Sequence, residues 1–202
     1  MNRRVSFIRD QRGASAAEFA LVLPLLLLLL FGMIDAGRFM WEYNRAEKAT
    51  QMGVRYAVVT NPVAPGLASY SFAVSGGVIA GDPVPVALFD NAVCDDTDCA
   101  PCVGGAVCGS IGYDPQAFAN LVARMSAMYP PIDAANVEIK YRNVGLGYAG
   151  DPNGPDVAPL VTVSLKNLQF QPISTLFFGV SVGMPDFRAA LTLEDGSGNV
   201  SN

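Results

Sequence analysis

The sequence has no histidine, few charged residues and only four cysteines, and these shortages exclude several classes of function. Without histidine, neither a Ser-His-Asp triad nor a Cys-His pair can form, and the commonest metal ligand is missing. Charged residues make up only 15% of the chain, and the 13 Lys and Arg are outnumbered by 18 Asp and Glu. An acidic chain lacks the basic face that binds phosphates, so we expect no nucleic-acid partner.

Charge is completely absent from residues 19–34, where leucines occupy every position from Leu25 to Leu30. A helix with no polar face is either buried on all sides or surrounded by lipid. The run is shorter than the roughly 20 residues that cross a bilayer. The small residues 14–17 extend it, but Glu18 interrupts the extended run. A carboxylate costs about 2.5–3.5 kcal/mol at the centre of a membrane segment, so Glu18 requires an explanation.

The distribution of arginine predicts how this segment is oriented. The first thirteen residues contain four arginines and a single acid, Asp10, whereas acids and bases cancel between Asp35 and Lys48. By the positive-inside rule, the N-terminus stays in the cytoplasm and the rest of the chain lies outside the inner membrane. A cleaved secretory signal is the alternative. Against it, the apolar run is longer than usual, and the best small residue after it, Ala36, has Ile34 at the −3 position.

The front edge of the run combines a glycine, an acid and an aromatic residue. If the chain were cut after Gly13, Ala14 would become the first residue, Glu18 the fifth, and Phe19 would follow it. The stretch GASAAEFALVLPLLLLLLFGMIDAGRFMW resembles the TadE-like family, the minor pseudopilins of the Tad (Flp) pilus system. This resemblance covers about residues 12–58. It implies a class III signal that prepilin peptidase cuts on the cytoplasmic side.

The resemblance also implies a role in pilus assembly. We expect a structural, non-enzymatic protein without a cofactor, residues 1–13 as a leader peptide, and a single-pass anchor in a bacterial inner membrane. The implied partners are prepilin peptidase, other pilins or pseudopilins and the pilus assembly platform. Glu18 would neutralise the new amine of Ala14 among packed helices. Alternatively, an acid in the first turn of a helix simply suits the helix dipole, or the protein is an anchored binding or adhesive protein unrelated to pili.

Helical character continues beyond the apolar run without a Gly or Pro cluster. We predict one helix over residues 14–59, with its transmembrane part over 14–35. Pro24 should bend this helix without breaking it. Trp41 and Tyr43 belong either to an aromatic belt at the membrane surface or to the core of the following domain.

Residues 60–113 are rich in Gly and Pro and contain all four cysteines. Two short runs in it, 70–74 and 84–89, are candidate strands. Cys94, Cys99, Cys102 and Cys108 fall within fifteen residues. Outside the inner membrane we favour two disulfides, with three possible connectivities. An iron-sulfur or zinc site and a redox-active C-x-x-C pair are the alternatives, and the predicted metal content is none.

The remaining chain predicts a small α+β outer domain over residues 114–195. Asp114 and Pro115 read as the N-cap and first position of a helix that stops before Pro130. Strictly alternating strands are predicted over 137–142 and 161–166, and a third over 187–194, which together form an antiparallel sheet. Residues 172–179 would form a short apolar helix or loop on the membrane or on the long helix. The tail, 196–202, has no reason to be ordered. A long N-terminal transmembrane helix followed by a small antiparallel sheet packed with a helix is a pilin-like plan.

Overall fold

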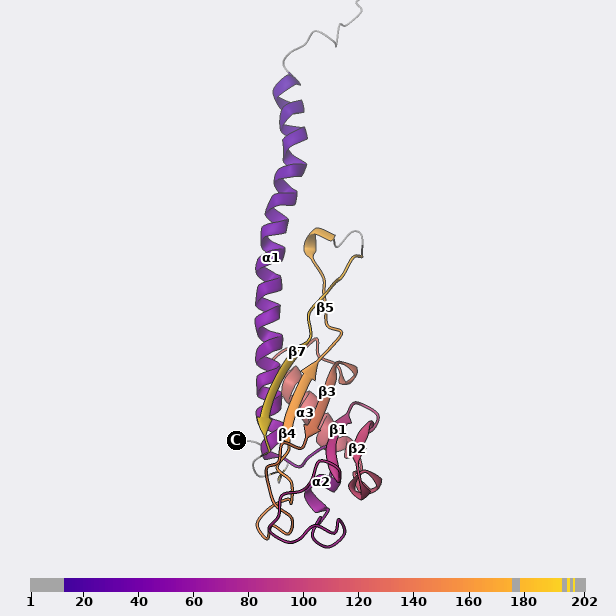
Figure 1. Ribbon diagram of the computed structural model, residues 1–202. Coiled ribbons are helices and arrows are strands. Elements are labelled where there is room, and N and C mark those ends of the chain that lie inside the picture. The colour runs from indigo at the N-terminus through magenta and orange to yellow at the C-terminus, as the bar shows by residue number, and fades with distance from the viewer. Residues whose placement is uncertain (1–12, 176–178, 194–195, 197, 199–202) are drawn as a thin grey trace, which may run out of the picture. The chain divides into compact units, whose positions relative to one another are not determined.

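A computed structural model describes residues 13–175, 179–193, 196 and 198 (Figure 1). The chain divides into two compact units, and helix α1 (Ala14–Val59) contributes to both. The first unit combines residues 1–41 with 170–182, and the second combines 42–169 with 183–202.

Helix α1 is the 46-residue helix that the sequence predicts. At 1.5 Å per residue it is about 69 Å long. Pro24 lies inside the helix and does not interrupt it. We refer to residues 15–34 as the apolar half of α1 and to residues 42–59 as its amphipathic half.

The second unit contains a five-stranded antiparallel sheet with the order β2-β1-β3-β4-β7. The strands are β1 (Phe89–Cys94), β2 (Cys102–Gly104), β3 (Val137–Arg142), β4 (Leu160–Leu165) and β7 (Phe187–Thr192). In the register of the central strands, Ile139 faces Val163 and Val163 faces Ala189. In β3, buried positions alternate with partly exposed ones, which is the pattern that identified this strand in the sequence.

Helix α3 (Pro115–Ser126) packs against this sheet, and the sequence predicts its start correctly. The carboxylate of Asp114 accepts hydrogen bonds from the backbone N–H groups of Gln116 and Ala117, at 2.9 and 3.0 Å. These bonds satisfy donors that have no partner within the helix. The other side of α3 meets the amphipathic half of α1 very closely, because a Cβ at Gly53 would lie 2.7 Å from the sulfur of Met125. The core of this unit therefore lies between the sheet, α3 and part of α1.

Two predicted strands are wrong. Residues 70–74 lie outside any strand, and 72–75 form a turn; the N–H of Phe72 donates to the carboxylate of Asp156 at 2.6 Å instead of pairing in a sheet. Residues 84–88 are also outside any strand, and only Phe89 of the predicted run belongs to β1. The apolar character of both runs reflects burial of single side chains in loops, since Phe72 and Val84 are almost completely buried. The remaining short elements of this unit are α2 (Gly66–Ser69), η3 (Ala106–Ser110) and η4 (Ala134–Asn136).

The first unit combines the apolar half of α1 and the residues that follow it with residues 170–182, which we call the 170–182 hairpin. Two short strands, β5 (Gln169–Phe170) and β6 (Val182–Gly183), pair at its base. Beyond them, η5 (Ile173–Thr175) forms a single turn of 3-10 helix, which lies beside α1 (Figure 1). The predicted apolar helix or loop over 172–179 corresponds in part to η5, and residues 176–178 lie outside the described residues. Most of the predicted tail also lies outside them.

Candidate functional site

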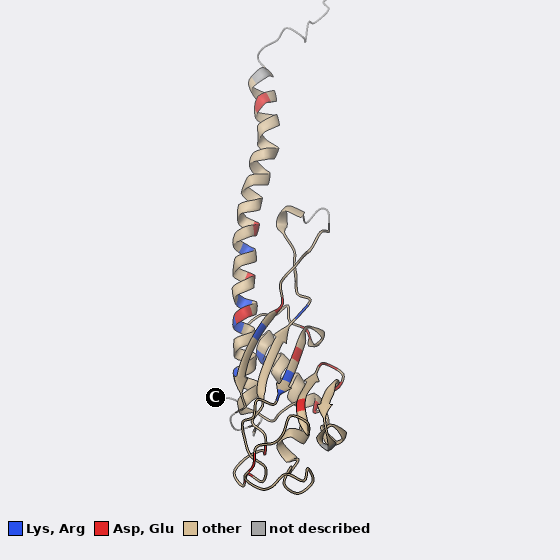
Figure 2. Cartoon of the chain, in the orientation of Figure 1, with Lys and Arg blue, Asp and Glu red and all other residues tan. Residues whose placement is uncertain are grey.

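The apolar half of α1 is exposed along its whole length. Its large side chains have exposed fractions of up to 81% for Leu21 and 72% for Leu25. Figure 2 shows that most of this half is a long stretch without charge, which begins after an acid near the start of α1 and ends at the charged residues further along. Within the described residues, α1 is the one helix long and apolar enough to cross a membrane, and none of its most apolar window is buried. Apolar surface of this extent requires lipid or other helices to cover it.

The predicted processing and assembly residues lie at the free end of this helix. Gly13 precedes α1 and is exposed, with no atom within 4 Å of the position that a Cβ would take. Ala14 is the first helical residue, and Glu18 and Phe19 are exposed. Glu18 lies one full turn inside the helix, and the first turn contains no acid. The favourable effect of a helix dipole falls off within that first turn, so a dipole interaction alone explains Glu18 poorly.

Asp35 ends the uncharged run, and its carboxylate is held by the 170–182 hairpin. One carboxylate oxygen accepts from the N–H of Ile173 at 2.7 Å, and the other accepts from the N–H of Ser174 at 2.9 Å. The side chain of Arg38 lies 3.6 Å from the same carboxylate. Asp35 is only 7% exposed. The acid therefore caps the turn η5, although the two segments are far apart in the chain.

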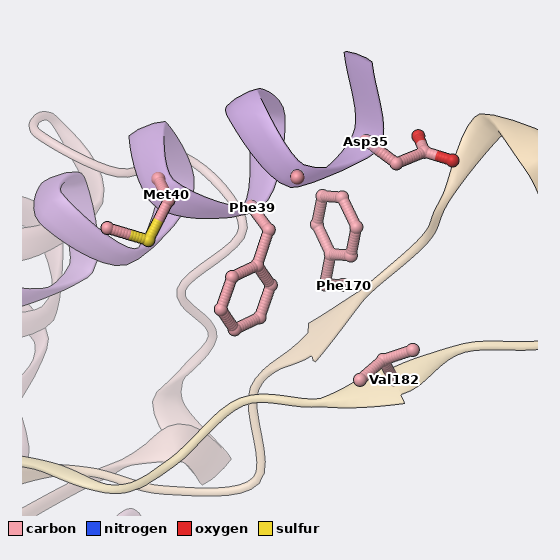
Figure 3. Close-up of a pocket in the computed structure, with 6 residues that line it drawn as sticks. Asp35, Phe39, Met40, Phe170 and Val182 are labelled. Carbon is pink, nitrogen blue, oxygen red and sulfur yellow. The ribbon is translucent and has the colours of Figure 1, made fainter. Parts of the chain in front are cut away.

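Aromatic contacts continue this attachment along α1. The rings of Phe39 and Phe170 meet edge to face with centroids 5.4 Å apart, and the guanidinium of Arg38 lies 5.3 Å from the centroid of Phe170. An open apolar pocket of about 390 Å³ lies beside these rings. Figure 3 shows Asp35, Phe39, Phe170 and Val182 around it. The pocket offers apolar contact but no convergent polar groups, so its chemistry is that of a packing surface.

The amphipathic half of α1 has a different kind of surface, since it belongs to the second unit and its residues contact other residues of that unit. The hydroxyl of Tyr129 donates to the carboxylate of Glu42 at 3.1 Å, and the guanidinium of Arg45 donates to the carbonyl of Met128 at 2.7 Å. Burial, together with the nearby Glu42 carboxylate, raises the pKa of Tyr129 to about 12. The two candidate belt aromatics differ: the ring of Tyr43 packs on Phe187, whereas Trp41 is 59% exposed.

The four cysteines form two local disulfides, Cys94–Cys99 and Cys102–Cys108. The first lies at the end of β1, and the second joins the start of β2 to η3. The C-x-x-C pair, Cys99 and Cys102, is therefore split between two different bonds. Oxidised sulfurs cannot act as thiolate ligands, and within the described residues no group of three or more His, Cys, Asp or Glu could hold a metal ion.

Residues 13–55 match the family model of the TadE-like proteins. This TadE-like segment begins at Gly13 and spans the apolar half of α1 and most of its amphipathic half, which is about a fifth of the chain. Neither the curated proteins nor the solved structures give a match. The TadE-like segment and its exposed apolar helix fit a membrane-anchored, pilus-associated protein.

Asp35 lies in the TadE-like segment, and the sequence does not reveal its contacts. Its position directly after the uncharged run is visible in the sequence. Its partners are backbone N–H groups 138 and 139 residues away. Backbone donors carry no residue signature, so only the folded structure identifies them.

Proposed function

We propose that the protein is a minor pseudopilin of a Tad (Flp) type IV-like pilus, anchored in the inner membrane with residues 1–13 in the cytoplasm and the sheet-containing unit outside. The role is structural. The single observation that carries this proposal is the exposed apolar half of α1 within a TadE-like segment that begins at Gly13. Helices of this kind can be stored in lipid and later packed against sister helices in a fibre.

Prepilin peptidase is the proposed processing partner. It would cut between Gly13 and Ala14, where the exposed glycine offers no side chain to obstruct the enzyme. The cut releases the arginine-rich leader and leaves the apolar half on the mature protein.

Glu18 has a proposed role once this cut is made. The new amine of Ala14 has an unperturbed pKa of about 7.7–8.0, so it is mostly protonated at neutral pH. A carboxylate one turn away, or the one on a neighbouring subunit, can neutralise this charge where helices pack and water is scarce. Phe19, exposed beside it, adds apolar contact to the same surface.

Two variants test processing and assembly separately. N-terminal sequencing of membrane-extracted protein should find Ala14 in the wild type, and Gly13→Ala should retain the leader. Glu18→Ala should be processed normally but enter the pilus fraction poorly. Glu47→Ala is the matched control, because Glu47 is also an exposed acid on α1 but lies in the amphipathic half. Retention of Met1 by the wild type in cells with active prepilin peptidase would contradict the cleavage site. Normal piliation by Glu18→Ala would contradict the proposed role of Glu18.

A further inference from the structure

The 170–182 hairpin is unusually apolar for a loop that projects from a sheet. Residues 167–185 contain no charged side chain. Within the described part of the hairpin, Ile173, Val180 and Val182 are 39%, 50% and 46% exposed. The hydroxyl of Thr175 donates to the carbonyl of Val180 at 2.9 Å, so a hydrogen bond joins the two limbs at these residues. Loops in water are normally polar, and this one presents apolar side chains to its surroundings.

The contacts of the hairpin fix its position along α1. Phe170 packs on Phe39, and the carbonyl of Gln171 accepts from Arg38 at 3.3 Å. Ile173, two residues further along the hairpin, bonds to Asp35. The hairpin therefore runs along the helix toward its apolar half. Its turn η5 lies level with the end of the uncharged run, which closes at Ile34.

The burial and the hydrogen bonds of Asp35 are those expected of an acid at the edge of the hydrocarbon layer of a membrane. A carboxylate at that depth is costly unless hydrogen bonds and a countercharge compensate it. Asp35 has both, since each oxygen accepts a backbone N–H and Arg38 lies close by. The acid is almost completely covered while its apolar neighbours on the helix, Met33 and Ile34, are 58% and 49% exposed. This combination of covered charge and exposed apolar side chains is inverted relative to a surface in water.

We propose that Ile173, Val180 and Val182 of the 170–182 hairpin insert their side chains into the interfacial layer of the membrane that the apolar half of α1 crosses, and that Asp35 holds them at that depth. The proposal rests on the proposed membrane anchoring of α1. The occupant of the surface is phospholipid, because the exposed apolar side chains of the hairpin continue those of the apolar half of α1. The hairpin thus acts as a second, shallow contact with lipid beside the spanning helix.

Quenching of tryptophan fluorescence by brominated lipid measures this depth. The full chain is reconstituted into vesicles of phosphatidylcholine and phosphatidylglycerol with brominated acyl chains, in a Trp41→Phe background that removes the single native tryptophan. Single tryptophans are then introduced as Leu28→Trp in the apolar half, Val180→Trp in the hairpin, and Val74→Trp, an 85% exposed position in the second unit. The expected loss of emission is largest at position 28, intermediate at position 180 and smallest at position 74.

The same series separates the inference from the proposed function. Strong quenching at 28 with none at 180 overturns the hairpin proposal alone, whether position 180 is then accessible to aqueous acrylamide or shielded by a protein partner. Absence of quenching at 28 overturns the membrane anchoring itself. Adding Asp35→Ala should reduce quenching at 180 toward the value at 74 and leave position 28 unchanged. Asp186→Ala, which removes an exposed acid beside Arg188, is the matched control and should change neither value. Unchanged quenching at 180 in Asp35→Ala overturns the role of Asp35.

Discussion

The two halves of helix α1 are made of similar proportions of helix-forming residues but differ in where their apolar side chains go. In the apolar half, large side chains such as Leu28 are exposed at every angle around the helix. In the amphipathic half, small and medium side chains such as Ala46, Ala49 and Val54 are buried, and the charged residues between them remain accessible. A helix with a polar face finds its partner within its own chain, whereas a helix without one needs a partner from outside.

The largest effects expected from this comparison come from introducing one aspartate into each half of α1. Ala49→Asp places a carboxylate at a fully buried position of the amphipathic half and should unfold the second unit. Leu28→Asp should leave that unit folded but cost about 2.5–3.5 kcal/mol of membrane insertion. Limited proteolysis in detergent reports the first effect and membrane fractionation reports the second. If the two variants behaved alike, the distinction between the halves would be wrong.

Loss of the disulfides should affect the stability of the second unit but not the apolar half of α1. Each closes a short loop within the second unit, so replacing Cys94 and Cys99, or Cys102 and Cys108, with serine should cost about 2 kcal/mol of unfolding free energy per pair. Membrane association through the apolar half should be unchanged. Thermal unfolding of wild type with and without reductant provides the measurement. Equal melting temperatures in the two conditions would contradict the assigned stabilisation.

A smaller effect is expected from a Val→Ala substitution made once in each half of α1. Val54 is 2% exposed and Val22 is 58% exposed, and both lie in α1. Val54→Ala should lower the unfolding free energy of the second unit by about 1–3 kcal/mol, because two buried methyl groups are lost. Val22→Ala should leave that free energy unchanged. Chemical denaturation in micelles tests both variants, and a comparable loss in Val22→Ala would show that the apolar half also supports the sheet-containing unit.

The smallest expected effect is the part of the alkaline pH dependence of stability that comes from Tyr129, which contacts the amphipathic half. The pKa of Tyr129 is raised to about 12, whereas an unfolded tyrosine titrates near 10. The neutral phenol is thus favoured in the folded state. Its contribution to the unfolding free energy is complete below pH 10 and is lost as the pH rises toward 12. Tyr129→Phe should flatten this decline in denaturation curves. At pH 7, the difference in unfolding free energy between the wild type and Tyr129→Phe measures the loss of the hydrogen bond to Glu42. If the decline of stability at alkaline pH were the same in Tyr129→Phe as in the wild type, the assignment to Tyr129 would be refuted.

The sequence predicted those elements whose periodicity is strong or whose caps are explicit. Helix α1, the start of α3 at Pro115 and strand β3 match the predicted boundaries, and β4 and β7 agree within two residues. Strands β1 and β2 escaped prediction because aspartate, glycine and cysteine surround them and conceal the alternation. Strand β1 joins the rest of the sheet through β3, where Asn91 faces Arg142, a contact between distant parts of the chain.

The sequence carries a signal for the candidate site only where that signal lies in a single local segment. The exposed run, Gly13 and Glu18 are adjacent in sequence, and the TadE-like match covers them. The disulfide partners could not be chosen among three connectivities, since all of them close short loops. The bond of Asp35 to η5 required the folded chain, because neither its backbone donors nor their distance in sequence leaves a pattern.

The 170–182 hairpin leaves the sheet after β4 and returns before β7, and these two strands are neighbours. Because the exit and the re-entry are adjacent, the sheet imposes no fixed length on what lies between them. The 170–182 hairpin can therefore be replaced without changing the strand pairing of the five-stranded sheet. Engineers could trim it to a tight turn, or exchange it for an epitope or a fluorophore, while every backbone ladder of the sheet stays as it is.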